Sequence, residues 1–217
     1  NAPSIIKDQE GSSRKLSLEL TAMINRLNNR MVPTRGYKIT SSLEFSSLDV
    51  DMIKFVAKGT RYHTVFNFPD WRGKHVLSYG GTLGMIEATS DEGIPIFENF
   101  FAGGANSIRG FAFRGVGPID VTTGEQIGGK ALILATAEYT VPVYSDMVRG
   151  AFFVDVGKAD TDLNDINANN LRATLGFGFR AKVPFMGNSV VAIDFGFPFI
   201  RKDKDDEQAI TFNFGGR

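Results

Sequence analysis

The sequence predicts an all-β fold, an antiparallel transmembrane β-barrel contributing about nine strands. Two observations carry this prediction: long segments in which apolar and polar residues alternate, and connections that alternate between short and long. Strand side chains point to opposite faces with a period of two, and a tilted strand needs about nine to eleven residues to cross a bilayer. Short turns at one end and long loops at the other are typical of outer-membrane barrels.

The alternation is longest in residues 171–183, where every odd position is apolar and every even position is polar or glycine. The segment from Val191 to Phe199 repeats the pattern, and Ile210, Phe212 and Phe214 repeat it near the end of the chain. In chain order, the predicted strands are 15–27, 36–47, 52–66, 74–88, 130–142, 148–158, 171–183, 191–199 and 209–214.

The predicted connections fall into two classes. The turns at 142–147 and 184–188 are short, whereas 158–170 and 201–207 are longer and polar, and 89–129 is the longest connection. We expect the long connections to face the outside of the cell and the short ones the periplasm.

Composition narrows the function. The chain has 24 basic and 24 acidic residues, which argues against a nucleic-acid partner because phosphate binding needs clustered Lys and Arg. It has no Cys and only His63 and His75, so we expect no disulfide, metal site, cofactor or catalytic centre. No apolar run reaches the about 18 residues that a transmembrane helix needs.

A soluble β-sandwich also produces alternating strands, but two features favour the membrane barrel. Phe, Leu and Ile dominate the apolar sides over more residues than the about five or six of a typical strand. The opposite sides carry Gly, Arg, Lys and Asp, as a water-filled lumen would.

The odd strand number leaves two alternatives, because an open sheet edge is unfavourable in a bilayer and bacterial barrels have even strand numbers. Either residues 1–14 contain a further strand, or the chain is the C-terminal part of a larger barrel. We favour the second alternative.

Arg109 lies in a glycine-rich stretch, residues 103–111, that can fold back into a barrel. A buried guanidinium must be paired, and two carboxylates occupy the inward side of neighbouring strands. Glu138 alternates with outward-facing Ala and Tyr residues, and Asp155 alternates with outward-facing Phe and Val residues. We therefore expect Arg109 to bridge to Asp155, with Glu138 close by, and to hold the long loop inside the lumen.

Two acidic groups are interpreted as solvated loop residues. The first group is Asp203, Asp205, Asp206 and Glu207 in the last loop, and it resembles a calcium cluster only loosely because basic residues are interleaved with it. The second group is Asp160, Asp162 and Asp165 in the loop before it.

The segment from Ser107 to Phe111 resembles the Val-Arg-Gly-Phe/Tyr loop motif of the outer-membrane β-barrel assembly superfamily, the BamA/TamA-like or bacterial surface antigen family. Phe153 to Gly157 matches the aromatic-x-Asp-x-Gly strand motif of that family. Glu138 falls where the family has an acidic strand residue, and Pro33 to Gly36 resembles its Pro-Thr-x-Gly turn.

The resemblance implies that residues 1–217 are the C-terminal part of a 16-stranded barrel whose periplasmic domains and first strands are absent. It implies a non-enzymatic integral protein of a Gram-negative-type outer membrane that assembles and inserts β-barrel proteins through a weak seam. The implied partners are outer-membrane lipids, unfolded β-barrel clients and accessory lipoproteins. Two alternatives stay open: a two-partner secretion-type translocation pore, and a barrel anchor for a missing enzymatic passenger.

The resemblance also assigns roles to residues. A loop latch, lumen partners of that latch and a seam on the last strand are implied. The loop latch is Ser107, Ile108, Arg109, Gly110 and Phe111. Its lumen partners are Asp155, Glu138 and Gly157, and the seam residues of the last strand are Ile210, Phe212 and Phe214.

Overall fold

The computed structural model describes residues 14–70, 73–91, 93–144, 147–162, 170–183 and 189–214. Nine antiparallel strands form one sheet in the order β1-β2-β3-β4-β6-β7-β8-β9-β11. Its strands are β1 (Lys15–Asn25), β2 (Gly36–Leu48), β3 (Met52–Asn67), β4 (Lys74–Ala88), β6 (Ala131–Tyr144), β7 (Val148–Asp160), β8 (Arg172–Val183), β9 (Ser189–Ile200) and β11 (Ile210–Phe214).

The nine predicted strands are confirmed, with ends that agree to within two residues. One alternative placed a further strand in residues 1–14, and 1–13 lie outside the described residues, as do 145–146, 163–169 and 184–188 in the predicted connections. Alternation alone located the strands because their two faces meet different surroundings along their whole length.

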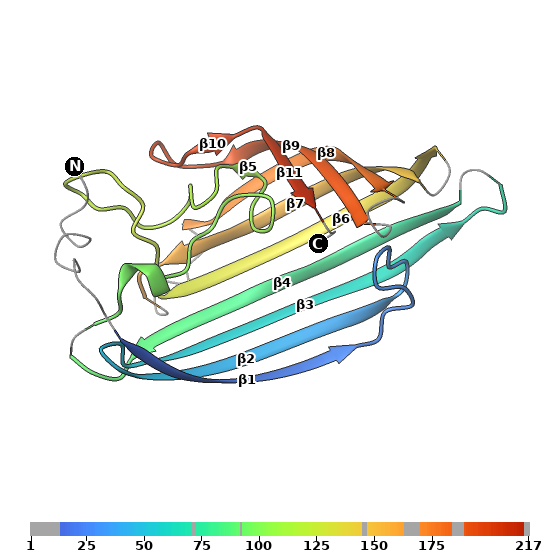
Figure 1. Cartoon of the computed structure of the whole chain (residues 1–217). Coiled ribbons are helices and arrows are strands. Elements are labelled where there is room, and N and C mark those ends of the chain that lie inside the picture. Colours follow the sequence, from blue (N-terminus) through green and yellow to red (C-terminus); the bar gives the residue numbers. More distant parts are fainter. Residues whose placement is uncertain are drawn as a thin grey trace.

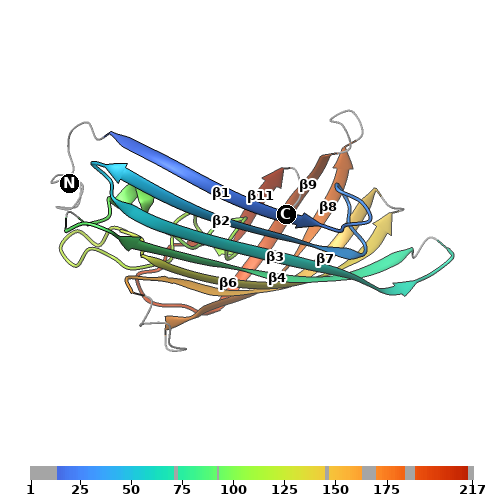
Figure 2. The ribbon, with the colours of Figure 1, turned by 90° about the horizontal axis from the view of Figure 1, so that it is seen from below.

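The sheet curves into a trough, and the long connection between β4 and β6 lies in its hollow at one end (Figures 1 and 2). This connection contains the short 3-10 helix η1 (Ile96–Glu98) and the two-residue strand β5 (Gly110–Phe111). β5 pairs with β10 (Glu207–Gln208), which belongs to the connection between β9 and β11. In the described part of the chain, no helix has the length and apolarity needed to span a membrane.

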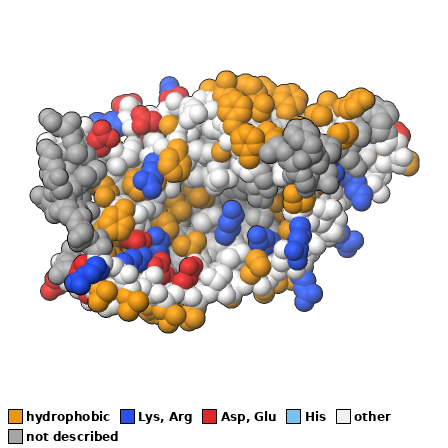
Figure 3. Space-filling view, in the orientation of Figure 1, with side chains coloured by type: hydrophobic (Ala, Val, Ile, Leu, Met, Phe, Trp, Pro, Cys, Tyr) orange, Lys and Arg blue, Asp and Glu red, His pale blue; other side chains and the backbone are white. Residues whose placement is uncertain are grey.

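The two faces of the sheet differ in character. On β7, Phe152 is 61% exposed on the convex side, whereas the neighbouring Phe153 and Asp155 are buried on the concave side. On the convex side, Phe177 of β8 stacks against Phe195 and Phe197 of β9, with ring centroids 5.2 and 6.2 Å apart. Hydrophobic side chains gather along the outer rims in Figure 3, and charged ones surround the hollow. This is the polarity of a barrel wall in lipid.

The long connection packs onto the concave wall through a hydrophobic cluster. Residues of the connection and of the wall are fully or almost fully buried together: Ala102, Ile108, Phe111 and Val116 from the connection, and Leu132 and Ala159 from β6 and β7. Burying this apolar surface favours the docked loop, because each fully buried large apolar side chain contributes about 1.5–3 kcal/mol.

Glu98 of η1 ties the start of the connection to the first strands. Its carboxylate lies 2.7 Å from Lys15 Nζ and 3.1 Å from Lys54 Nζ. Burial raises the pKa of Glu98, but hydrogen bonds and charges of the two lysines lower it by more, so the pKa lies below its ordinary value. A carboxylate of this kind stabilises the fold above its unfolded pKa.

We therefore expect the η1 segment to loosen as the pH falls below 4.5, the ordinary value, and through the lowered pKa of the folded protein. Hydrogen exchange of residues 94–100, corrected for the intrinsic pH dependence of exchange, measures this. The Glu98→Gln variant should show the same protection at all these pH values. A pH-independent wild type would contradict the assignment.

Candidate functional site

Arg109 reaches from the long connection into the wall of the trough and is buried. Its Nε and Nη2 donate to the two oxygens of Asp155 over 2.7 and 2.8 Å, and its backbone N–H donates to the same carboxylate over 3.1 Å. Nη1 donates to Glu138 over 2.6 Å. The guanidinium carbon lies 3.4 Å from the centroid of the Phe153 ring. Two-pronged contact with a carboxylate is the geometry in which arginine binds most strongly and specifically.

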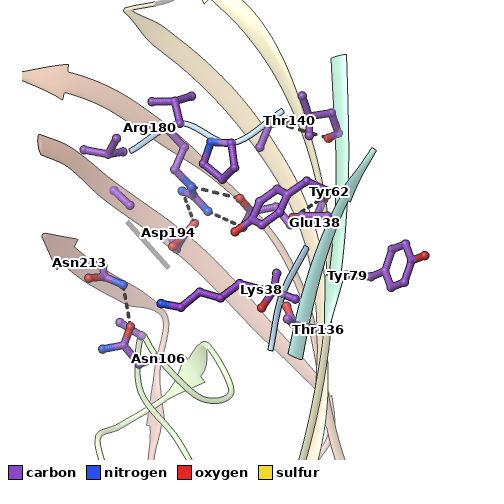
Figure 4. Close-up of a pocket in the computed structure, with 18 of the residues that line it drawn as sticks. Lys38, Tyr62, Tyr79, Asn106, Thr136, Glu138, Thr140, Arg180, Asp194 and Asn213 are labelled. Atoms are coloured by element: carbon purple, nitrogen blue, oxygen red, sulfur yellow. Dashed lines mark hydrogen bonds and ion pairs between the residues drawn. The ribbon is translucent and has the colours of Figure 1, made fainter. Parts of the chain in front are cut away.

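A second arginine continues the network. Arg180 of β8 lies 2.7 Å from Glu138 and 2.7 Å from Asp194 of β9, and Figure 4 shows it pointing between the two carboxylates. Asp194 is also 3.6 Å from Arg109 Nη1. Thr136 Oγ1 donates to Asp155 over 2.6 Å. Each buried charge in this network thus has an opposite charge within 4 Å, which a low-dielectric site requires.

The electrostatic effect on the loop arginine has a clear direction. Burial lowers the pKa of Arg109, but the hydrogen bond and charge of Asp155 and the charges of Glu138 and Asp194 raise it by more. The pKa of Arg109 therefore lies above its ordinary value, and the side chain stays charged at every physiological pH.

The structure brings the two predicted acids, Asp155 and Glu138, to Arg109. Sequence reasoning did not single out Arg180 and Asp194 as site residues, although the alternation placed both on the inward side of their strands. The missing information was register: Gly178 of β8 lies opposite Asp194, and this sets Arg180 beside it.

Gly110 allows the loop to lie against the wall. Its φ of +90° is one that L side chains rarely adopt, and a Cβ there would be 2.8 Å from Thr174 Cγ2 and 3.1 Å from the carbonyl carbon of Gly196. Gly196 has no room for a side chain either, since a Cβ there would be 2.7 Å from Gly110 Cα. Two glycines therefore let the motif backbone touch β8 and β9.

Gly110→Ala should destabilise the docked loop by about 1–3 kcal/mol, the cost of a non-glycine residue held in such a backbone conformation, before any clash is added. Hydrogen exchange of residues 100–116 measures the loss. Gly124→Ala is the matched control, because Gly124 also has a positive φ (+76°) but has no heavy atom within 4 Å of its Cβ position. Equal losses in the two variants would show that close contact with the wall does not matter.

The other latch residues have structural roles in the loop. Ser107 Oγ accepts a hydrogen bond from the backbone N–H of Gly103 over 3.1 Å, which closes the turn before the motif. Ile108 and Phe111 are fully buried in the hydrophobic cluster. A Cβ at Gly157 would be 2.7 Å from Leu134 Cδ2, so the glycine leaves room for a side chain that packs against this cluster.

The last loop is bound to the latch segment, and this corrects the expectation of a solvated acid at Asp205. Asp203, Asp206 and Glu207 are exposed, as expected. The side chain of Asp205 is buried and accepts hydrogen bonds of 2.9 and 2.7 Å from Nε and Nη2 of Arg172 in β8. The backbone N–H of Ala112 donates to the backbone carbonyl of Asp206 over 2.8 Å, and the backbone N–H of Asp206 donates to the carbonyl of Gly115 over 3.0 Å. The loop folds inward because these groups satisfy one another.

Asp160 also departs from the expectation of surface polarity. It is buried, and its carboxylate pairs with Lys158 on the same strand. Neighbouring alternate positions of a strand share a face, and the pair compensates for the removal of both charges from water. Asp165 lies outside the described residues.

The last strand has two contrasting sides. Ile210, Phe212 and Phe214 are exposed on the convex side, and β11 pairs with β9 over residues 191–195 only. Asn213, on the concave side, donates to Asn106 of the latch loop over 2.8 Å (Figure 4). No strand of the described residues pairs with the other edge of β11.

A cavity of about 300 Å³ lies beside the charge network. Its walls come from β2, β3, β4, β6, β7, β8, β9 and β11, from the connection between β1 and β2, and from the latch loop. Lys38, Glu138, Arg180 and Asp194 line it (Figure 4). The hollow in Figure 3 shows basic side chains around this region.

Comparison with known proteins supplies the family. The model of the Omp85 superfamily domain matches residues 1–217, the whole chain. The chain belongs to the Omp85 superfamily. The recognition of an outer-membrane β-barrel assembly family from the loop and strand motifs is thus confirmed, and this Omp85 chain is an integral outer-membrane protein segment.

Similar curated proteins include two bacterial outer membrane protein assembly factors BamA. The chain is 28% identical over 221 residues to that of Neorickettsia risticii and 29% identical over 215 residues to that of Nitratidesulfovibrio vulgaris, covering 98% and 96% of this chain but 28% and 26% of those proteins. A SAM50-like protein of Drosophila melanogaster is 24% identical, over 99% of this chain and 48% of its own length. The Omp85 chain thus spans about a quarter of the length of its BamA relatives.

Among solved structures, BamA from Haemophilus ducreyi lacking POTRA domains 1–3 superimposes with a TM-score of 0.76 at 21% identity. The match covers 90% of this chain and 41% of that one. At this identity the likeness concerns the fold, and it confirms an antiparallel sheet of the BamA barrel type.

Proposed function

We propose that the intact protein folds and inserts β-barrel proteins into the outer membrane, and that this chain is the C-terminal part of its 16-stranded barrel. The single observation that carries the proposal is the loop arginine held by Asp155 and Glu138 inside the trough, in a chain whose curated relatives are named as assembly factors. The proposed partners are outer-membrane lipids, unfolded β-barrel clients and accessory lipoproteins. The proposed role needs no enzymatic chemistry.

The proposed working surface is the free edge of β11. Backbone N–H and C=O groups at an unpaired edge form hydrogen bonds with an added strand, which is β-augmentation. β11 is only five residues long and pairs with fewer than half of the twelve residues of β9. A short last strand makes a weak seam with the first strand of the complete barrel, so a client strand can displace the first strand from the edge of β11 at little cost.

The latch is proposed to hold this seam in its resting position. The motif strand β5 pairs with β10, and β10 is separated from β11 by Ala209 alone. Asn106 of the latch loop also bonds to Asn213 of β11. Because the same loop is fixed to the wall through Arg109, its release should loosen the last strand.

The test uses the intact protein reconstituted in phospholipid vesicles with an unfolded β-barrel client. Client folding, followed by the gel shift between folded and heat-denatured client, should be faster than in empty vesicles. A photoreactive residue at Asn213 should form crosslinks to the client. The proposal is contradicted if the client folds equally fast in vesicles with and without the reconstituted protein. If the protein also carries a soluble polypeptide across the bilayer, the secretion pore is favoured.

A further inference from the structure

The convex side of β2, β3, β4 and β6 changes character toward one end of the strands. Apolar residues give way to side chains with polar tips, which we call the polar belt: Tyr37, Arg61, His63, His75, Tyr79 and Tyr139. Arg61 belongs to the convex side because its neighbours Thr60 and Tyr62 both line the concave cavity. In Figure 4 the Tyr79 ring likewise points away from that cavity.

The belt is an organised set of contacts. Tyr37, Arg61 and Tyr79 occupy directly opposite positions on β2, β3 and β4. His63 Nε2 and Tyr79 Oη are hydrogen bonded over 3.2 Å, with their rings stacked. His75 Nδ1 and Tyr139 Oη are hydrogen bonded over 2.8 Å. These bonds fix the rings of Tyr79 and Tyr139, which both lie on the β4 and β6 side of Arg61.

The neighbourhood of Arg61 lacks a compensating charge. Its nearest positions on the same face are Gly59 and His63 along β3 and the two tyrosines across it, none of them acidic. Within the described residues, Arg61 takes part in no ion pair. A cation on the outer wall of a barrel is unfavourable at the bilayer centre and is tolerated near the interface, where a lipid headgroup can supply the opposite charge.

The belt lies toward the end of the sheet opposite the latch loop. β3 ends at Asn67 and β4 begins at Lys74, so this end carries a short connection. In outer-membrane barrels the short connections face the periplasm, and aromatic girdles mark the interface there. Arginine can extend its guanidinium toward the headgroups while its methylene chain stays in the apolar layer.

We propose that Arg61, with the hydroxyls of Tyr37 and Tyr79, binds the phosphate of a phospholipid in the periplasmic leaflet. A guanidinium presents its N–H donors in a planar fork that matches phosphate oxygens, and the tyrosine hydroxyls donate from either side. The acyl chains lie along the apolar strand faces on the bilayer-centre side of the belt, where Ile39 is exposed. The site anchors the barrel wall to one lipid at a fixed depth.

The experiment is native mass spectrometry of the intact protein with phosphatidylglycerol and with a lipid of identical acyl chains that carries a sugar in place of the phosphate headgroup. The wild type should retain phosphatidylglycerol about ten-fold better than the sugar lipid, and Arg61→Gln should remove that difference. Arg61→Lys, which keeps the charge, should retain most of it. Millimolar inorganic phosphate should not displace the lipid, because the acyl chains contribute to binding.

Lys38→Gln is the matched control. Lys38 lies on β2, the strand next to that of Arg61, and its substitution removes one positive charge from the concave side instead of the convex side. It should retain phosphatidylglycerol as the wild type does. Equal retention of the two lipids by the wild type, equal losses in Arg61→Gln and Lys38→Gln, or displacement by inorganic phosphate would each overturn the proposal. If Arg61→Gln fails to give the folded gel shift, Tyr79→Phe decides: an about three-fold loss supports the site, and unchanged retention overturns it.

Discussion

Replacing Arg109 with alanine should destabilise the docked long loop by about 3–5 kcal/mol, the cost of breaking a buried ion pair from one side. Asp155, which is fully buried, loses both of its contacts with the guanidinium and keeps the hydrogen bond from Thr136. Glu138 and Asp194 retain Arg180, so the penalty falls mainly on Asp155. Hydrogen exchange of residues 100–116 and protease sensitivity of the loop measure the effect.

Arg114→Ala is the matched control for this prediction. Arg114 belongs to the same connection but is exposed, and its guanidinium carbon lies 4.4 Å from the Phe101 ring centroid. An exposed contact of this kind contributes about 0.5–1 kcal/mol. The loss of loop stability in Arg109→Lys should lie between those of Arg109→Ala and Arg114→Ala, because lysine keeps the positive charge but lacks the planar guanidinium that binds both oxygens of Asp155. A loop that stays as protected in Arg109→Ala as in Arg114→Ala would refute the latch.

Phe177→Arg should cost about 2–4 kcal/mol of folding free energy in a phospholipid bilayer, the penalty for a charge near the middle of the lipid-facing wall. Phe177 is near the centre of β8, and its ring packs against Phe195 and Phe197 on the convex side. Urea titration of the intact protein in vesicles measures the loss.

Tyr144→Arg provides the depth control. Tyr144 ends β6, is 73% exposed and lies beside a short connection, so the same new charge sits near the interface. There the expected penalty is about 0–1 kcal/mol. If both variants lose equal stability, or if Phe177→Arg loses none, the convex side of β8 does not face lipid.

The strands and their facing could be predicted from sequence because lipid and lumen impose opposite requirements on successive residues. This constraint holds at every position of 171–183, so assigning the faces of this strand one residue out of step would put Arg180 into hydrocarbon. The contact between Arg109 and Asp155 was predictable because a guanidinium on a loop folded into the barrel must be paired, and the alternation puts Asp155 on the inward side of its strand.

The contacts that depend on register or on loop shape could not be predicted. The pairing of Arg180 with Asp194 needs the offset between β8 and β9, which alternation does not specify. The pair of Arg172 and Asp205 joins a strand to a loop 33 positions away. Strands as short as β5 and β10 contain too few residues to show a period, so the link between latch and last strand became visible only in three dimensions.

The most direct test of the central claim, that Arg109 fastens the loop through Asp155, is a double-mutant cycle with Arg109→Ala and Asp155→Ala. Loop stability is measured by hydrogen exchange of residues 100–116 in the intact protein. The double variant should be less destabilised than the sum of the single variants, with a coupling energy of about 2–3 kcal/mol. Effects that add to within about 0.5 kcal/mol would show that the two side chains act independently and would contradict the account.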